Sequence, residues 1–598
     1  MSVFFDVVIM GGGPAGATLG AILAQESLLS VAIYEKDTFP RDHIGESFAH
    51  PLIPVLEQSG ALAKVLASDC WVKKYGGVFN WDDAGPSLAY FDHANWLRDG
   101  VHRWSMHVNR SQFDHILLDH ARSCGVEVFQ GIKVVEVDCQ AGAQPRLILA
   151  GGDEVRARVL VDASGRHNKT LAGGNRAWLS SYRNVATWQH FTGGRFTQNL
   201  EGDWNIFQDG NFSPIGCFAF DDGWCWYIPV PKDIDGKRRL THSIGIVTNP
   251  DVLSRPGKDF TDPEVFLRTV KSVPMLADLV QDVRPVSDGM LTATNYSRIS
   301  DSFCNAEEGW MLIGDSAYFV DPLFSSGVAF AAAQASAAAL VIRLTLEDRI
   351  PVTERDDLWR DYDKGWQGMA ETYALSIDQW YHAIGERRPE SAYWNSHGSF
   401  NPQFREDTFQ ALLNTAFTPD LLQVMTRGSG RLAELNREGP YMRARAEAEP
   451  AALGEDAVVV LTPAATARPG IGLDVPGFKS FVPPPPFTIP AAAMDLIARY
   501  WRNPVVAGPS TPAPLDQALP CLRFVGAHGS VRSLPDRDAG DVLWARLKNG
   551  PIAYRDLCSG LDTPSILLLD QMRFAGVVEV QGPATTATHE TMDAGARR

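Results

Sequence analysis

The residues with the clearest chemical purpose are Gly11–Gly16, which read Gly-Gly-Gly-Pro-Ala-Gly. They follow a predicted strand, Val7–Met10, and open a predicted helix, Ala15–Gln25. Glycines here let the backbone turn sharply and approach a pyrophosphate, and the helix N-terminus attracts the phosphate charge. Glu35, about 20 residues on at the end of the strand Val31–Tyr34, can accept hydrogen bonds from ribose hydroxyls. A plain tight turn is the alternative. The pattern predicts dinucleotide binding through Gly11, Gly13, Pro14, Ala15, Gly16 and Glu35.

The stretch Trp224-Cys225-Trp226-Tyr227-Ile228-Pro229 sets two indoles at alternate positions of a predicted strand. Side chains two residues apart point to the same face of a strand, and an indole fills space at a small entropy cost. The hexapeptide therefore predicts a rigid aromatic wall that can seal a cavity. A core strand that contains two tryptophans is the alternative.

Two further segments, Leu160–Gly165 and Leu312–Ala317, have the pattern of a strand that ends in a turn with aspartate and glycine. Together with the glycine run they resemble, in order, the three fingerprints of the FAD-dependent aromatic hydroxylase superfamily. The resemblance implies FAD as the cofactor, with Asp315 beside its ribitol and pyrophosphate. It also implies cations near the flavin phosphates at Arg41 and Arg110, where a guanidinium offers paired hydrogen bonds.

Three motifs resemble the flavin-dependent halogenases within this superfamily. The tryptophan hexapeptide matches their W-x-W-x-I-P signature, Lys74 opens a K-x-G-x-x-F-x-W stretch, and Phe319–Gly327 matches F-x-x-P-x-x-S-x-G. The segment His43–Ser47 resembles the G-E-S turn that these enzymes place near the isoalloxazine, which makes Ser47 a cofactor-binding residue. The resemblance extends over residues 4–345 and fades beyond them.

The resemblance implies an FADH2-dependent halogenase that adds chlorine, or bromine, to an electron-rich aromatic or activated aliphatic carbon in secondary metabolism such as antibiotic biosynthesis. Reduced flavin and O2 would give a C4a-hydroperoxide, and chloride or bromide would attack it. The hypohalous acid would then pass Trp224 and Trp226 to the catalytic Lys74. Burial lowers the pKa of a lysine, and its side chain can hold hypohalous acid or form a haloamine with it. The alternative is that Lys74 and Lys73 are a pair of solvated lysines without a catalytic role.

The loop Phe319–Gly327 is expected beside the flavin, with Pro322 and Gly327 near the cofactor. Chloride is expected at Ser326 and Gly327, because backbone N–H groups at the start of a helix attract an anion. The alternative to a chloride site is a plain helix N-terminus capped by serine, which would have much the same sequence.

One position departs from the tryptophan halogenases, which carry a glutamate after the proline of this loop where the chain has Phe324. The difference favours a phenol, a pyrrole or an aliphatic acyl group, free or on a carrier protein, over free tryptophan. A separate flavin reductase is the implied partner, and Asp288 is where a covalent bond to FAD would be sought. A single-component FAD monooxygenase that uses NAD(P)H is the alternative function, and a flavin-binding scaffold is a third.

The overall composition is that of an acidic globular protein. The 598 residues are 45% hydrophobic, and a net charge of −17 argues against a nucleic-acid partner. The eight cysteines are scattered and form no C-x-x-C pair. We therefore expect no metal site, and we expect a reducing, cytoplasmic setting. The apolar run 327–344 includes Gln334 and Arg343, which predicts a buried helix rather than a membrane span.

These elements predict an α/β (α+β) fold. Residues 1–375 would form an FAD-binding, Rossmann-like core, with an inserted antiparallel substrate sheet at about 180–300. A helical region is expected at 376–482, and a small C-terminal domain at 487–598 after a proline-rich linker. Helical periodicity is found in Pro51–Leu66, Arg110–Cys124, Trp359–Leu375 and Phe409–Thr426.

Overall fold

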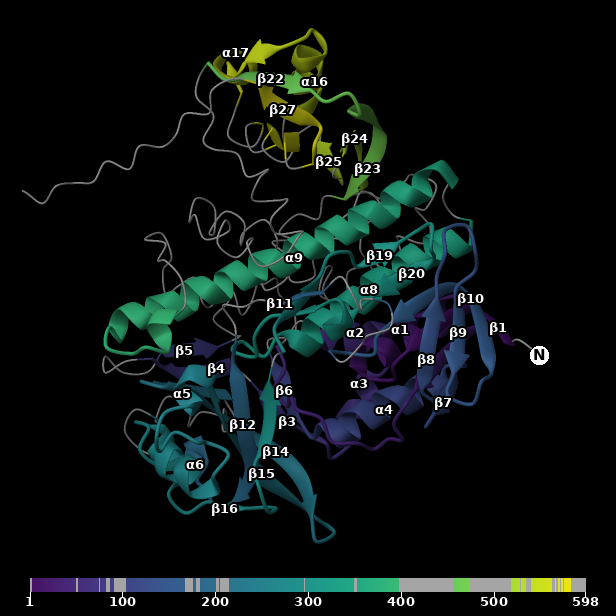
Figure 1. The fold of residues 1–598 in the computed structure, drawn as a ribbon. Coiled ribbons are helices and arrows are strands. Elements are labelled where there is room, and N and C mark those ends of the chain that lie inside the picture. The colour runs from purple at the N-terminus through teal and green to yellow at the C-terminus, as the bar shows by residue number, and fades with distance from the viewer. Residues whose placement is uncertain are drawn as a thin grey trace, which may run out of the picture.

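The computed structural model describes residues 3–396 and 456–581, each with gaps (Figure 1). In the first range the gaps are 50–51, 75, 82–86, 91–103, 167–170, 172–175, 179–182, 201–203, 205–214, 295 and 349–351. In the second range they are 474–517, 528, 534–538, 562–564, 566–567, 570–571 and 574. The predicted helix Phe409–Thr426 and the proline-rich linker lie outside the described residues.

The first sheet is built around β1 (Val3–Met10), in the order β19-β20-β10-β1-β2-β7. Strands β10 (Glu154–Asp162), β2 (Val31–Glu35), β7 (Glu127–Gln130) and β20 (Trp310–Leu312) all run parallel to it. Parallel strands end at the same edge, so the turns after β1, β2, β10 and β20 meet there. This arrangement is the predicted Rossmann-like α/β fold. The remaining strands are β19 (Cys304–Asn305), β8 (Val134–Asp138) and β9 (Arg146–Leu149).

Helices lie against one face of this sheet (Figure 1). Helix α1 (Pro14–Glu26) packs against both α4 (Arg110–Ser123) and α8 (Gly327–Leu346). Helix α8 is long and apolar enough to cross a membrane, but 83% of its most apolar window is buried inside the protein. It is therefore a core helix, as its sequence predicted. The long helix α9 (Val352–Arg387) packs along it.

The second sheet has the order β16-β12-β15-β14-β13-β4-β5, with β17 beside β12. Its pairs are antiparallel except β13 with β4. The predicted insert thus recruits two strands from before residue 100. A single hydrophobic core runs from the first sheet through this one to Trp394. The strands are β4 (Gly76–Asn80), β5 (Ser87–Tyr90), β12 (Val185–Thr192), β13 (Ile215–Phe220), β14 (Gly223–Ile234), β15 (Lys237–Thr248), β16 (Arg284–Pro285) and β17 (Leu291–Thr294).

Shorter elements connect the two sheets. Strand β3 (Trp71–Lys74) pairs with β6 (Ser105–Val108), and β11 (Arg176–Trp178), β18 (Arg298–Ser300) and β21 (Tyr318–Phe319) form a small sheet. The predicted helix Pro51–Leu66 is in fact two. Gly60, at φ +75°, adopts a left-handed conformation that interrupts it. The helices are α2 (Leu52–Gln58), α3 (Leu62–Leu66), α5 (Pro250–Leu253), α6 (Pro263–Val270) and α7 (Leu276–Val280).

Residues 376–387 are helical as expected, since they continue α9, but residues 456–473 are not helical, which corrects the expectation for that part of 376–482. It forms β22 (Val458–Leu461), which pairs with β27 (Val578–Gln581), and β23 (Thr466–Leu473), which pairs with β24 (Ala518–Gly526). The run of β-branched residues in β22 favours a strand over a helix. These strands share a small core with later elements. The division of the chain into domains stays a prediction. The later elements are β25 (Gly529–Ser533), α16 (Gly540–Lys548), β26 (Ile552–Ala553) and α17 (Tyr554–Cys558).

Candidate active site

The glycine turn after β1 is held in a shape that only glycine allows. Gly11 has φ +104°, and a Cβ there would lie 2.5 Å from the carbonyl oxygen of Ala163. A Cβ on Gly16 would lie 2.0 Å from the carbonyl oxygen of Gly11. Glu35 is buried and anchors the turn, since its carboxylate accepts hydrogen bonds from the backbone N–H groups of Gly12 (2.7 Å) and Asp37 (2.9 Å). A role for Glu35 at a ribose stays a prediction.

Space for a phosphate group lies at the start of α1. Gly13 is the N-cap, Pro14 is the first helical residue, and no side chain of the described residues caps the helix. A Cβ on Gly13 would meet, within 4 Å, only Nη2 of Arg41 at 3.7 Å among the described residues. An uncapped helix N-terminus next to a guanidinium is suited to bind a pyrophosphate. The cradle therefore fits the FAD that the sequence predicts.

Asp315 is brought to this cradle by the turn after β20. Gly314 has φ +63°, and a Cβ on it would lie 3.2 Å from Cβ of Ala15 at the start of α1. The third fingerprint therefore meets the first at the sheet edge, although they are about 300 residues apart in sequence.

Arg110 holds a loop of the protein itself. Its guanidinium forms a two-point ion pair with the buried Asp114, at 2.8 and 2.9 Å. It also donates to the carbonyl oxygens of Ile44 (2.7 Å) and Gly45 (3.0 Å). These bonds fix the turn that ends at Ser47, so Arg110 positions the turn. Direct contact of Arg110 with flavin phosphates stays a prediction.

Lys74 is buried, with 2% of the residue exposed. Its Nζ donates to Oγ of Ser47 at 2.8 Å and to the carbonyl oxygen of Phe48 at 3.0 Å. Burial lowers its pKa to about 7. Lys73 points to the other face of β3, where its Nζ lies 5.4 Å from the centroid of the Trp104 ring. The alternative of a solvated lysine pair therefore does not fit Lys74.

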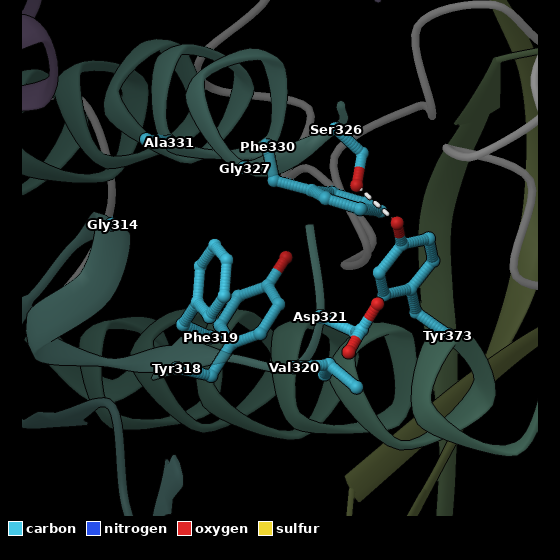
Figure 2. A pocket seen from close by; sticks show the side chains of 10 residues that line it. All are labelled: Gly314, Tyr318, Phe319, Val320, Asp321, Ser326, Gly327, Phe330, Ala331 and Tyr373. Atoms are coloured by element: carbon cyan, nitrogen blue, oxygen red, sulfur yellow. Dashed lines mark hydrogen bonds between the residues drawn. The ribbon is translucent and has the colours of Figure 1, made fainter. Parts of the chain in front are cut away.

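Two pockets meet at the loop before α8. The first holds about 270 Å³ of empty space, part of it open to solvent, and Figure 2 shows its side chains. The second holds about 210 Å³ and lies against Lys74. Residues 321, 326 and 327 line the first, and residues 323–325 line the second. The loop therefore forms part of the wall of both. The second is lined by Lys74, Gly76, Gly77, Phe79, Ile215, Leu323, Phe324 and Ser325.

Ser326 is buried in the first pocket and does not cap α8 with its side chain. Its hydroxyl instead shares a hydrogen bond with the hydroxyl of Tyr373 on α9 (Figure 2). Gly327 begins the helix, so its N–H is one of the groups that a helix leaves without an internal acceptor. Ser325, with φ +57°, turns the chain into this position. The arrangement is compatible with the predicted halide site, which stays a prediction.

Trp224 and Trp226 are buried on the face of β14 that is directed toward Lys74. They lie opposite Ala219 and Cys217 of β13, and Cys217 lies beside Phe79, which lines the pocket of Lys74. The indoles line neither of these two pockets. Nε1 of Trp224 donates to Tyr381, and Nε1 of Trp226 donates to Ser243 at 3.3 Å. Both indoles are therefore held in place by hydrogen bonds to other elements.

Two buried carboxylates of the site were given no role by the sequence. Asp321 lines the first pocket, and Glu46 pairs with His190, whose Nε2 lies 2.6 Å from Oε1 of Glu46. Burial opposes ionisation of Glu46, but His190 and Lys232 lower its pKa to about 2. Both carboxylates lie inside motifs that were identified in the sequence. An acidic residue with no assigned role inside such a motif was the sequence feature that could have pointed to them. Asp288 lies in an exposed turn after β16.

Comparisons with known proteins find similar proteins among the halogenases. Residues 94–238 match the family model described as tryptophan halogenase. The tryptophan 2-halogenase of Chondromyces crocatus is 29% identical over 398 residues, which cover 65% of this chain and 70% of that protein. The 1H-pyrrole-2-carbonyl-(peptidyl-carrier protein) chlorinase of Pseudomonas fluorescens is 29% identical over 452 residues, which cover 71% of this chain and 92% of that protein.

The fold is also found in a solved structure. The crystal structure of CmlS, a flavin-dependent halogenase, superposes with a TM-score of 0.61 at 22% identity, over 97% of this chain and 96% of that one. At this identity the likeness shows a shared fold.

Proposed function

The chain belongs to the flavin-dependent halogenase family, and from this premise we propose that it delivers hypohalous acid through Lys74 to a substrate carbon. It is an enzyme that uses FAD, a halide and O2, and halogenation is favoured over the alternative of hydroxylation. The observation that carries the proposal is the burial of Lys74 beside the loop that also lines the pocket of Ser326.

The glycine cradle is the proposed FAD site. Bound there in its reduced form, FAD would supply two of the four electrons that reduce O2, and the halide, oxidised to hypohalous acid, would supply the other two. Proposed contacts come from two helix N-termini and the turns at the same sheet edge. They are Gly11, Gly13, Pro14, Ala15, Gly16, Glu35, Arg41, Ser47, Arg110, Asp315, Pro322 and Gly327.

The halide is proposed to bind at Ser326 and Gly327. The N-terminus of α8 favours an anion there, because the helix dipole and the first N–H groups are directed toward it. Leu323 and Phe324, which precede this position in the loop, are buried and line the pocket of Lys74. Their apolar side chains are proposed to keep water out of the route. Trp224 and Trp226 are proposed to stiffen this wall from behind.

Lys74 is proposed to receive the hypohalous acid. With a pKa lowered to about 7 by burial, its Nζ is available at neutral pH both as an ammonium donor and as an amine. The ammonium would polarise hypohalous acid through a hydrogen bond. The amine would form a haloamine by releasing water. In both cases Ser47 and Phe48 hold Nζ in place.

The substrate is proposed to be an electron-rich ring of the phenol or pyrrole type, free or tethered to a carrier protein. The pocket at Lys74 is lined mostly by apolar residues, with Phe324 where tryptophan halogenases have a glutamate. The name of the relative from Pseudomonas fluorescens specifies a pyrrole-2-carbonyl group on a carrier protein. A separate flavin reductase in the cytoplasm is the proposed source of reduced flavin.

The test is mass spectrometry of products from the purified holoenzyme with a flavin reductase, NADH, chloride or bromide, and phenolic, pyrrolic and carrier-bound substrates. We expect a product with the isotope pattern of one added halogen. A gain of one oxygen without halogen would contradict the proposal. Steady NADPH oxidation by the enzyme without a reductase would instead favour the monooxygenase.

A further inference from the structure

Asp321 is a carboxylate enclosed in the wall of the first pocket, with 1% of the residue exposed. It accepts hydrogen bonds from the N–H of Leu323 (3.0 Å), from Nδ2 of Asn184 (3.1 Å) and from the hydroxyl of Tyr381 (3.2 Å). Figure 2 shows it in the same pocket as Ser326 and Gly327. An acidic side chain therefore lies next to the place proposed for an anion.

Among the described residues, the titratable groups that face Asp321 come from four parts of the chain and remain neutral near pH 7. They are phenols from α9, from the segment after it and from the segment before β18, and a thiol from β13. Burial raises the pKa of each one, and none supplies a positive charge. The groups are Tyr296, Tyr373, Tyr381, Tyr393 and Cys217.

Burial makes the charged form of Asp321 costly. It raises the pKa of Asp321 to about 7, although the hydrogen bonds from Leu323, Asn184 and Tyr381 act in the opposite direction. A halide in the same water-poor pocket would add the repulsion of a second negative charge, which a low dielectric strengthens. Two anions in one pocket are far less favourable than a halide next to a neutral carboxylic acid.

We propose that Asp321 takes up one proton from solvent when a halide enters this pocket, so that the enzyme binds its halide together with a proton. The inference rests on the proposed halide site at Ser326 and Gly327. Asp321 then makes the affinity for halide depend on pH: it is an acid when the halide is bound and a carboxylate when the pocket is free of halide above neutral pH.

The test is the pH dependence of bromide binding to the FAD-loaded enzyme, followed by the flavin absorbance spectrum. For wild type we expect the apparent Kd for bromide to rise about thirtyfold from about pH 6 to about pH 8.5, tending to tenfold per pH unit at the alkaline end. For Asp321→Asn, whose amide is neutral throughout, we expect less than about a threefold change over the same range.

Titration of Lys74 could produce a similar pH dependence of bromide binding, because Lys74 also loses its charge near pH 7. Lys74 and Asp321 also both interact with the buried thiol of Cys217. Lys74→Ala separates the two: we expect it to keep the pH slope of wild type. A flat wild-type profile, or an unchanged slope in Asp321→Asn with normal flavin content and melting temperature, would overturn the inference. A slope that disappears in Lys74→Ala would assign the proton to the lysine and also overturn it.

Failure of the proposed function has a different signature. If bromide binds with the expected pH slope but no halogenated product forms with any substrate, the proposed function is what has failed. If halogenated product forms while the Kd for bromide is independent of pH, the proton linkage at Asp321 has failed and the function stands.

Discussion

The indole Nε1 of Trp224 donates a hydrogen bond to the hydroxyl of Tyr381 at 2.8 Å. Tyr381 lies on α9 and in turn donates to Asp321 at 3.2 Å. Hydrogen bonds through Tyr381 thus connect the tryptophan motif on β14 with the loop before α8. No sequence motif had pointed to this part of α9. Trp224 therefore contributes a specific hydrogen bond to the site as well as aromatic bulk.

We predict that Trp224→Phe weakens halide binding while Trp226→Phe does not. The first change removes the donor to Tyr381 and loosens Asp321, and a lost buried hydrogen bond costs about 1 kcal/mol of stability. Trp226 donates instead to Ser243, so its replacement is the matched control. The measurements are the KM for bromide and the melting temperature of both variants. Equal shifts of KM in the two would show that only aromatic packing matters.

We predict that Lys74→Ala lowers the rate of product halogenation by about 10²–10⁴-fold, the range for loss of a positioned catalytic group. Hypohalous acid should still be released, because the flavin cradle is untouched, and monochlorodimedone would detect it. Lys73→Ala is the control, since Lys73 lies over Trp104 on the other face of the strand. A variant at Lys73 that loses activity as severely would count against the assignment.

We predict that the stability of the wild-type protein rises with pH above neutrality relative to Lys74→Met. The folded protein holds a proton on Lys74 only up to about pH 7, whereas the unfolded chain holds it up to the ordinary pKa of 10.5. Between these values the unfolded chain binds more protons, so raising the pH favours folding by at most about 1.4 kcal/mol per pH unit. Urea denaturation of both proteins between about pH 7 and pH 9 measures the difference. A constant difference across this range would show that the pKa of Lys74 is not lowered.

We predict that Gly13→Ala folds normally but loses at least about tenfold in FAD affinity, because its Cβ fits the protein and occupies phosphate space. Gly16→Ala should instead destabilise the whole fold, since its Cβ would overlap the carbonyl oxygen of Gly11. Flavin titration and thermal unfolding distinguish the two effects. Normal FAD binding by Gly13→Ala would place the pyrophosphate elsewhere.

Much of the first half of the fold could be predicted, because its signals are local. The turn Gly11–Gly16 needs glycine for reasons of nearby backbone geometry, and the alternation of Trp224 and Trp226 follows from the period of a strand. The apolar run of α8 likewise predicted a buried helix. The recruitment of β4 into the second sheet could not be predicted, since its parallel partner β13 lies more than 130 residues away in sequence.

By itself, then, the sequence determined the family, and it predicted the glycine turn for the cofactor and the residue types that the proposed chemistry requires. Only the tertiary structure decided which lysine is buried, how Arg110 is engaged, and that Asp321 lies beside Ser326. The spacing of residues in a motif gives only their relative positions along one strand or loop. The pKa of a side chain and its hydrogen-bond partners depend on segments far away in sequence, such as α9, whose Tyr381 meets Asp321 across 60 residues.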